Sequence, residues 1–479
     1  MNVIVVISDT LRRDHLGCYG NPWIQTPNLD AFAQESLTLD RAYISSFPTV
    51  PCRNDVLTGR YTFTYRPWAP LEAGQTTLPE LLGQAGRITG LVADTPHPFT
   101  PGYNFQRGFQ SWEIIRGQEH DPWKAHPREV SLPCAPEKLR SPDSTVAQYL
   151  RNVHERRSEA DYFPARTFTA AAEWLEHNHR HPFFLYVDTF DPHEPWDPPR
   201  HYVERYDPGY EGEEVIYPRY DVSSYLTDAE LKHCRALYAA EVSLVDTWFG
   251  HFMNRVRSLG LLANTAILFL ADHGFYLGEH GFIGKSLITP EYQQALPLYP
   301  EVAWIPFLAY LPEGLHGERR EGFAQPVDIL PTVLELCGLP MPDGVQGRSL
   351  APLLRGEVEA VRPVAISSPC LSAPTFQVPH PTNRASITDA EWTLIYGSQV
   401  DRVQEPEVTA MVDSLLRQVR TLEQGPIRPQ LFHLPEDPFC NRDVLEAHPE
   451  QAQRLHAAFV QFLEEAGVPE THLRFFRAL

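Results

Sequence analysis

Four uninterrupted apolar runs recur along the first part of the chain. Residues 3–8, 88–92, 183–187 and 265–270 are rich in β-branched and aromatic side chains, which is typical of strands buried on both faces of a parallel sheet. The runs end at or beside an aspartate, namely Asp9, Asp94, Asp188 and Asp272. Because α/β folds carry their chemistry at the carboxyl ends of such strands, the pattern predicts a sheet edge lined by carboxylates.

The segments between these runs alternate between helical periodicity and irregular stretches. Apolar spacing near 3.6 predicts helices over 78–85, 166–177 and 228–259, whereas 95–165 and 194–225 are rich in proline and show no clear period. Beyond Gly356, short alternating strands are expected over 364–366, 384–388 and 392–396, and an amphipathic helix over 445–466. The prediction is an α/β fold in which helices sandwich a large mixed, mostly parallel sheet. Residues 1–360 form this domain, and residues 361–479 a smaller antiparallel sheet with a helix.

Composition narrows the classes of partner. The net charge of -21 argues against nucleic acid and anionic membranes, because both need a basic surface. No apolar run reaches the ~18 residues of a membrane span. Met1 leads directly into the first strand without a basic leader, and the seven cysteines are scattered without a CxxC pair. We therefore expect reduced cysteines and a cytoplasmic location. The sequence leaves homo-oligomerisation open.

One segment carries a family resemblance. Residues 45–61 read SSFPTVPCRNDVLTGRY, which resembles the sulfatase signature of Cys or Ser, any residue, Pro, Ser, Arg and, five residues later, Thr-Gly. Pro51 and Arg53 match that signature, and Thr49 occupies the position where sulfatases carry a cysteine oxidised to formylglycine. Similar late-domain and C-terminal stretches occur at 328–334, 347–350, 392–396 and 431–438. The resemblance therefore covers nearly the whole chain and implies an alkaline phosphatase-like fold and an ester hydrolase.

The resemblance also implies a metal site. Asp9 and Asp272 match the family's ligands, and His273 matches the variant seen in phosphonate monoester hydrolases of the superfamily. Together with Thr49, the set also resembles one metal site of the nucleotide pyrophosphatase/phosphodiesterase family, which uses a threonine nucleophile. Spacing alone would equally fit a structural Asp-His pair. We expect one divalent ion, calcium, manganese or zinc, and the imidazole favours the latter two. A second metal, of the phosphodiesterase type near Asp188 and His193, is not indicated, because these two residues lie one position too far apart for the motif.

Thr49 is the candidate nucleophile, since a divalent metal can lower the pKa of a hydroxyl toward working pH. The structural alternative is that Thr49 only caps the N-terminus of a helix. Arg53, four residues on, is expected to hold the Thr49 alkoxide or the substrate oxyanion. No formylglycine is expected at Cys52. By resemblance, His193 and Lys285 bind the transferred group. The resemblance also assigns substrate contacts at three further positions, which are Thr95, His97 and His280.

These residues predict a metal-dependent hydrolase that cleaves small anionic esters through a covalent intermediate on Thr49. A threonine has one hydroxyl, whereas hydrated formylglycine has two and can expel sulfate with the second. This difference favours phosphate or phosphonate esters, while the family name favours sulfate esters. The alternatives are a degenerate anion-binding relative and a phosphoryl transferase.

Overall fold

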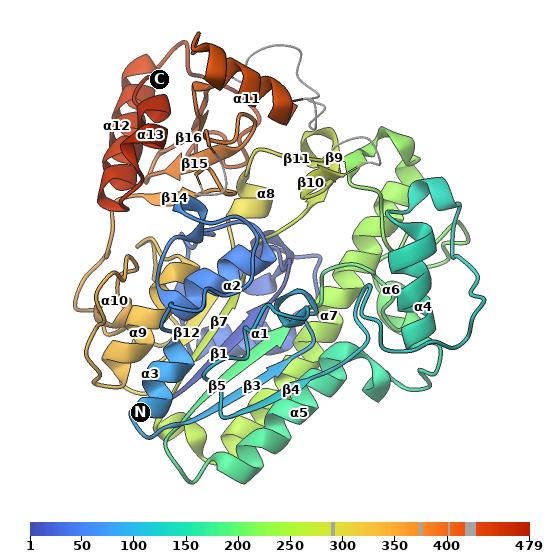
Figure 1. Ribbon diagram of the computed structural model, residues 1–479. Coiled ribbons are helices and arrows are strands. Elements are labelled where there is room, and N and C mark those ends of the chain that lie inside the picture. The colour runs from blue at the N-terminus through green and yellow to red at the C-terminus, as the bar shows by residue number, and fades with distance from the viewer. Residues whose placement is uncertain (289–292, 373–376, 401–402, 417–427) are drawn as a thin grey trace.

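The computed structural model describes residues 1–288, 293–372, 377–400, 403–416 and 428–479 (Figure 1). Its central sheet has eight strands in the order β13-β2-β12-β7-β1-β5-β3-β4. In chain order these strands are β1 Asn2–Ser8, β2 Leu37–Leu39, β3 Ile88–Ala93, β4 Ser111–Ile114, β5 Phe183–Thr189, β7 Thr265–Ala271, β12 Phe307–Tyr310 and β13 Arg319–Arg320.

Strand direction confirms the predicted mixed, mostly parallel sheet. β1 pairs in parallel with β5 and β7, and β3 pairs in parallel with β5 and β4. Among the described strands of this sheet, only β12 runs antiparallel to its neighbours, which are β7 and β2. The four predicted runs are the four central strands β7, β1, β5 and β3, and nearly all of their side chains are buried. Their carboxyl ends therefore meet at one edge.

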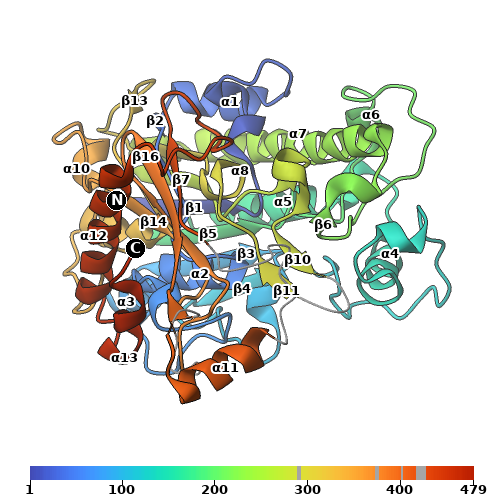
Figure 2. The same ribbon diagram turned by 90° about the horizontal axis from the view of Figure 1, so that it is seen from above.

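Helices cover both faces of this sheet (Figure 2). α1 (Pro27–Gln34), α5 (Phe163–Asn178) and α7 (Asp228–Ser258) pack together on one face, and α2 (Thr49–Thr58), α3 (Leu78–Gln84) and α9 (Ile329–Leu336) on the other. The predicted bounds of α3 and α7 lie within one residue of the observed bounds. α7 begins as predicted because Thr227 caps it, accepting a hydrogen bond from the backbone N–H of Glu230. α5 starts three residues earlier than predicted, with Pro164 in its first turn, where proline needs no N–H partner.

The C-terminal part forms the predicted second sheet. β14 (Ala365–Ser367), β15 (Arg384–Thr388), β16 (Trp392–Gly397) and β17 (Gln430–His433) are antiparallel neighbours in that order. α12 (Pro449–Glu465) covers it, and its side chains Leu455 and Phe459 share a hydrophobic cluster with the sheet. This helix starts four residues later than predicted, at Pro449. The sheet contacts the larger part directly, because Gln325 Nε2 donates to the Ile366 carbonyl at 2.9 Å. The domain boundary at residue 360 stays a prediction.

The remaining elements are short. They include two small sheets, made by β6 (Asp221–Val222), β9 (Phe282–Gly284) and β8 (Tyr276–Leu277), and by β10 (Ser286–Ile288) and β11 (Gln293–Ala295). The short helices are α4 Ala147–Val153, α6 Arg200–Val203, α8 Pro300–Ala303, α10 Ala351–Leu354, α11 Pro406–Leu416 and α13 Glu470–Leu473. Some fall in the predicted irregular stretches, where elements of two to seven residues are too brief to show a period. No helix in the described ranges combines the length and apolarity needed to cross a bilayer.

Candidate active site

The carboxyl edge of the central sheet gathers three of the predicted aspartates around one arginine. Asp9 follows β1, Asp188 lies near the end of β5 and Asp272 follows β7. Arg53, in the second turn of α2, donates from Nε and Nη2 to Asp188 at 3.0 and 2.7 Å. Its Nη1 donates to Asp272 and lies 3.1 Å from Asp9 Oδ2. Three carboxylates therefore share one guanidinium, and all four side chains are buried.

This charge imbalance is reflected in the pKa values. Burial and the neighbouring Asp272 carboxylate raise the pKa of Asp9 well above its usual range. Burial would also raise the pKa of Asp272, but Arg53 and His273 hold it below its usual range. Asp9 Oδ2 is buried and makes no hydrogen bond, although Arg53 is close. An orphaned carboxylate oxygen beside excess negative charge is what a bound cation would satisfy.

The expected metal ligands converge beside the Asp9 carboxylate. His273 Nε2 lies 3.8 Å from Asp9 Oδ1, 3.6 Å from Asp272 Oδ2 and 3.4 Å from Thr49 Oγ1. His273 Nδ1 lies 3.0 Å from the Gly274 carbonyl, which fixes the tautomer so that the lone pair of Nε2 faces the carboxylates. Burial lowers the pKa of His273 to about 3, so the ring is neutral. Two carboxylates, a neutral imidazole and a hydroxyl therefore fit a divalent ion, and the family uses one.

The neighbouring backbone is strained where it holds this set. Thr10 adopts a left-handed φ of 62°, which is a rare conformation for a β-branched residue. In that conformation its N–H donates to Asp272 at 2.9 Å and its hydroxyl donates to Asp9 at 2.7 Å. Strain of this kind persists only where surrounding contacts enforce it, and it concentrates at functional sites.

A cavity of about 730 Å³ opens above Thr49. Thr49 is the first residue of α2, and the cavity wall carries Lys285 and His193. Lys285 Nζ lies 2.9 Å from His193 Nε2 and 3.1 Å from His273 Nε2. Burial and the Lys285 ammonium keep the pKa of His193 well below its usual range. The Lys285 ammonium and the neutral His193 imidazole thus face the cavity beside Thr49, while His273 is buried next to the Thr49 hydroxyl.

The cavity also has a polar wall that sequence reasoning missed. Glu119 is buried there and contacts His97, His120 and Arg140. Burial alone would raise the pKa of Glu119, but His97 and the other basic neighbours lower it well below its usual range. The signal available in the sequence was the polar run of residues 118–121, shortly after β4. That run did not indicate that the ends of β3 and β4 lie side by side.

Three predicted residues do not lie where expected. Arg53 does not line the cavity: it donates to Asp188, to Asp272 and to the backbone carbonyl of Thr49. Thr95 is fully buried and donates to Asp188 at 2.8 Å. His280 stacks on Tyr299, with ring centroids 4.1 Å apart, away from the cavity lining. In each case the chain folds the side chain back onto a neighbouring element instead of into the cavity.

Two other predictions concern Asp188 and Cys52. Both oxygens of Asp188 accept hydrogen bonds from Arg53 or Thr95, and Asp188 belongs to none of the metal-ligand clusters among the described residues. Cys52 is buried in α2, where burial raises the pKa of its thiol well above its usual range. All seven cysteines are free thiols.

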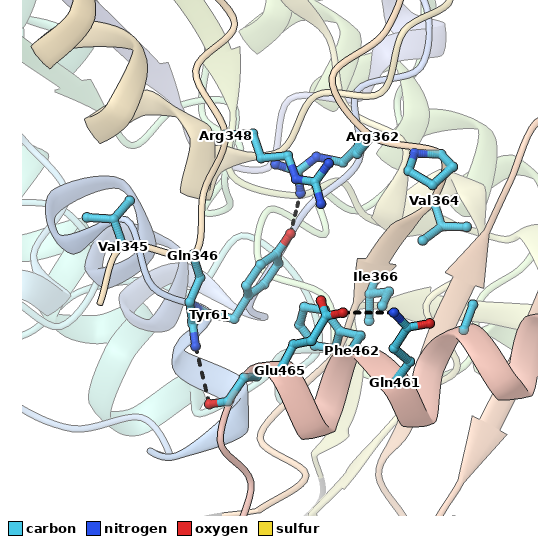
Figure 3. A pocket seen from close by; sticks show the side chains of 13 residues that line it. Tyr61, Val345, Gln346, Arg348, Arg362, Val364, Ile366, Gln461, Phe462 and Glu465 are labelled. Atoms are coloured by element: carbon cyan, nitrogen blue, oxygen red, sulfur yellow. Dashed lines mark hydrogen bonds between the residues drawn. The ribbon is translucent and has the colours of Figure 1, made fainter. Parts of the chain in front are cut away.

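A second cavity lies apart from this chemistry. It measures about 370 Å³ and lies between the end of α2 and helix α12 (Figure 3). Tyr61 and Arg362 line it, and the Arg362 guanidinium donates to the Tyr61 hydroxyl and to Asp328. None of the predicted site residues contributes to its wall.

Known proteins resemble this chain over most of its length. The model of the family described as Sulfatase matches residues 1–339. The N-acetylglucosamine-6-O-sulfatase of Bacteroides thetaiotaomicron is 25% identical over 415 residues, covering 74% of this chain and 71% of that protein. The multifunctional alkaline phosphatase superfamily protein PehA of Trinickia caryophylli is 25% identical over 423 residues, covering 74% and 77%. The phosphonate monoester hydrolase of Agrobacterium radiobacter superposes with a TM-score of 0.72 at 20% identity, covering 97% and 96% of the two chains.

Proposed function

This chain belongs to the sulfatase family of ester hydrolases, and from that premise we propose that it cleaves phosphate or phosphonate esters with Thr49 as its nucleophile. The observation that carries the proposal is the position of Thr49. Its hydroxyl lies at the cavity floor, 3.4 Å from His273 Nε2 and beside the carboxylate cluster. The cysteine three residues later, Cys52, is buried and does not line the cavity.

In the first step, Thr49 Oγ1 forms a bond to phosphorus and the ester oxygen departs on the opposite side. Asp9, Thr49, Asp272 and His273 would hold a divalent ion, which would lower the pKa of the Thr49 hydroxyl and offset negative charge on the phosphoryl group. Lys285 donates hydrogen bonds to the developing anion or to the departing oxygen. The departing oxygen leaves as an alcohol, and the proton that Thr49 gives up balances the one it gains. His193 holds the Lys285 ammonium at 2.9 Å.

In the second step, water attacks phosphorus and the bond to Thr49 Oγ1 breaks, which regenerates the hydroxyl. Direct attack by water is the route open to threonine, because it lacks the second hydroxyl that hydrated formylglycine uses to expel sulfate. Arg53 acts as a positioning residue: its guanidinium holds Asp188, Asp272 and Asp9 in place beneath the floor. The substrate would be a small anionic ester, drawn by Lys285 and Arg140 in the cavity wall.

A second candidate is a true sulfuric ester hydrolase. The specific observation in its favour is the name of a relative, the N-acetylglucosamine-6-O-sulfatase, which is similar over 74% of this chain. The two candidates share the fold, the metal ligands and the nucleophile. They differ in the second step, which is harder for a sulfuryl adduct on threonine than for a phosphoryl adduct. The cytoplasmic location also stays a prediction.

Substitution of Thr49 tests the proposal. Thr49→Ala should lower turnover of aryl phosphate, bis-aryl phosphate and aryl phosphonate about 1,000-fold or more, while Thr49→Ser keeps substantial activity. Thr58→Ala, a buried threonine at the other end of α2, is the matched control and should keep the parent rate. Thr49→Cys should move the sulfate-to-phosphate rate ratio toward sulfate if a maturation enzyme converts the new cysteine. Parent-level activity of Thr49→Ala on every ester would refute the nucleophile assignment.

A further inference from the structure

Two histidines and one glutamate meet in the cavity wall, away from the carboxylate cluster at the floor. His97 Nε2 lies 3.1 Å from Glu119 Oε2, and His120 Nδ1 lies 3.3 Å from the same oxygen. The two imidazole centroids are 5.5 Å apart. His97 follows β3 and the other two follow β4, so pairing of these strands brings the three together. The proposed ester cleavage uses none of the three.

We propose that His97, Glu119 and His120 form a second metal site, which binds a divalent transition ion of the zinc type. Two imidazoles and one carboxylate are a known ligand set of catalytic zinc, and imidazole selects transition metals over calcium and magnesium. All three residues line the cavity, so the remaining coordination position opens toward substrate.

The distances suit such an ion. Zinc bonds to nitrogen and oxygen of about 2.0–2.2 Å in a tetrahedron place neighbouring ligand atoms about 3.3 Å apart. The two measured separations to Glu119 Oε2, 3.1 and 3.3 Å, are close to that edge length. The two imidazole nitrogens lie within 4.8 Å of each other, so an ion taking the place of the hydrogen-bonded protons would draw the rings together.

The surrounding residues hold the set as the supporting residues of metal sites do. The Tyr217 hydroxyl donates to Glu119 Oε1 at 2.8 Å, on the carboxylate oxygen that the histidines leave unused. Trp68 and Phe190 contact the His97 ring edge-on, with centroids 5.3 and 5.7 Å away. Glu119 itself has a left-handed φ of 43°, a strained conformation that directs its carboxylate between the two rings.

The proposed site is independent of the metal at the cavity floor. The floor ligands Asp9, Asp272 and His273 share no residue with the wall ligands, although Glu119 also belongs to a third cluster with His193 and Glu194. His97 and His120 are the ligands that distinguish the proposed site from that third cluster. The proposal therefore goes beyond the proposed esterase and does not depend on the role of Thr49. A variant of one site leaves the ligands of the other in place.

Zinc titration of the metal-stripped full chain tests the proposal, with isothermal calorimetry and elemental analysis as readouts. The variant Asp272→Asn removes the floor site and should still bind one equivalent of zinc. Adding His120→Ala or Glu119→Gln to it should abolish that binding, and Tyr217→Phe should weaken it about 10- to 100-fold. The His120 side chain is 51% exposed, so its removal should not unfold the chain.

His177→Ala, at the exposed end of α5, is the matched control and should keep the zinc of the Asp272→Asn background. Cobalt(II) in that background should give the ligand-field absorption of a nitrogen- and oxygen-bound ion, which His97→Ala removes. Two results would overturn the proposal. One is that the Asp272→Asn chain binds no zinc, which would mean that His97, Glu119 and His120 form an ion-paired cluster and not a metal site. The other is a zinc affinity that His120→Ala and Glu119→Gln leave unchanged.

Discussion

Replacing Arg53 with methionine should destabilise the protein, because its guanidinium is the cation that three buried carboxylates share. Arg53 is 1% exposed, donates twice to Asp188 at 3.0 and 2.7 Å, and also contacts Asp272 and Asp9. Methionine keeps much of the volume and none of the charge. Removing one partner of a buried ion pair costs about 3–5 kcal/mol, since the remaining charge is left without compensation.

The expected fall in melting temperature follows from the size of the chain. Unfolding entropy of about 2.1 cal/mol/K per residue gives about 1 kcal/mol/K for 479 residues. The cost therefore corresponds to a Tm about 3–5 °C below that of the parent. Scanning calorimetry of the metal-stripped proteins measures it. Arg477→Met is the control, because this arginine forms ion pairs only at the surface and should change Tm little.

Adding a metal distinguishes the effect of the lost charge in Arg53→Met from the effect of altered packing. With Arg53 gone, the floor carries more uncompensated negative charge, so Mn²⁺ should raise the Tm of Arg53→Met more than that of the parent. If the variant melts within a degree of the parent without metal, the shared guanidinium is not a stabilising element. If Mn²⁺ raises both melting temperatures equally, the carboxylates do not respond to the lost charge, and the electrostatic reasoning fails.

Three shorter predictions concern the metal, the thiol and the pH dependence of stability. Asp272→Asn should lose one equivalent of bound metal by elemental analysis; full occupancy would contradict the ligand assignment. Cys52 should show the mass of an unmodified cysteine in intact-mass spectrometry even with a formylglycine-forming enzyme co-expressed, and an aldehyde there would contradict the register of the motif. Burial raises the pKa of Asp246 to about 6, above its unfolded value, so its contribution to stability is present at low pH and is lost as pH rises through 6. The stability of Asp246→Asn relative to the parent should therefore improve by about 1–2 kcal/mol between pH 5 and 7.5 in urea unfolding, and a constant difference would refute this linkage.

The sequence alone determined the framework of the fold and the floor of the site. Continuous apolar runs indicate strands buried on both faces, and parallel strands of this kind end at a common edge, so the pattern predicted an edge lined by aspartates. The family resemblance selected Asp9 and Asp272 from these aspartates. The resemblance of residues 45–61 to the sulfatase signature added Thr49 to this set. The start of α7 is predicted closely because Thr227 and Glu230 form a local capping box that needs no tertiary partner.

Only the tertiary structure decided what each polar side chain faces. The motifs predict substrate contact for Arg53 and Thr95, yet both bind Asp188, because buried charge and hydroxyl groups must find partners inside the protein. His280 likewise stacks on Tyr299. The resemblance predicted a substrate contact for His97, but the sequence did not indicate that Glu119 and His120 lie beside it, because pairing of β3 with β4 brings them together. Local patterns record which residues are buried; the direction of a buried polar group depends on neighbours distant in the chain, and only the folded protein supplies them.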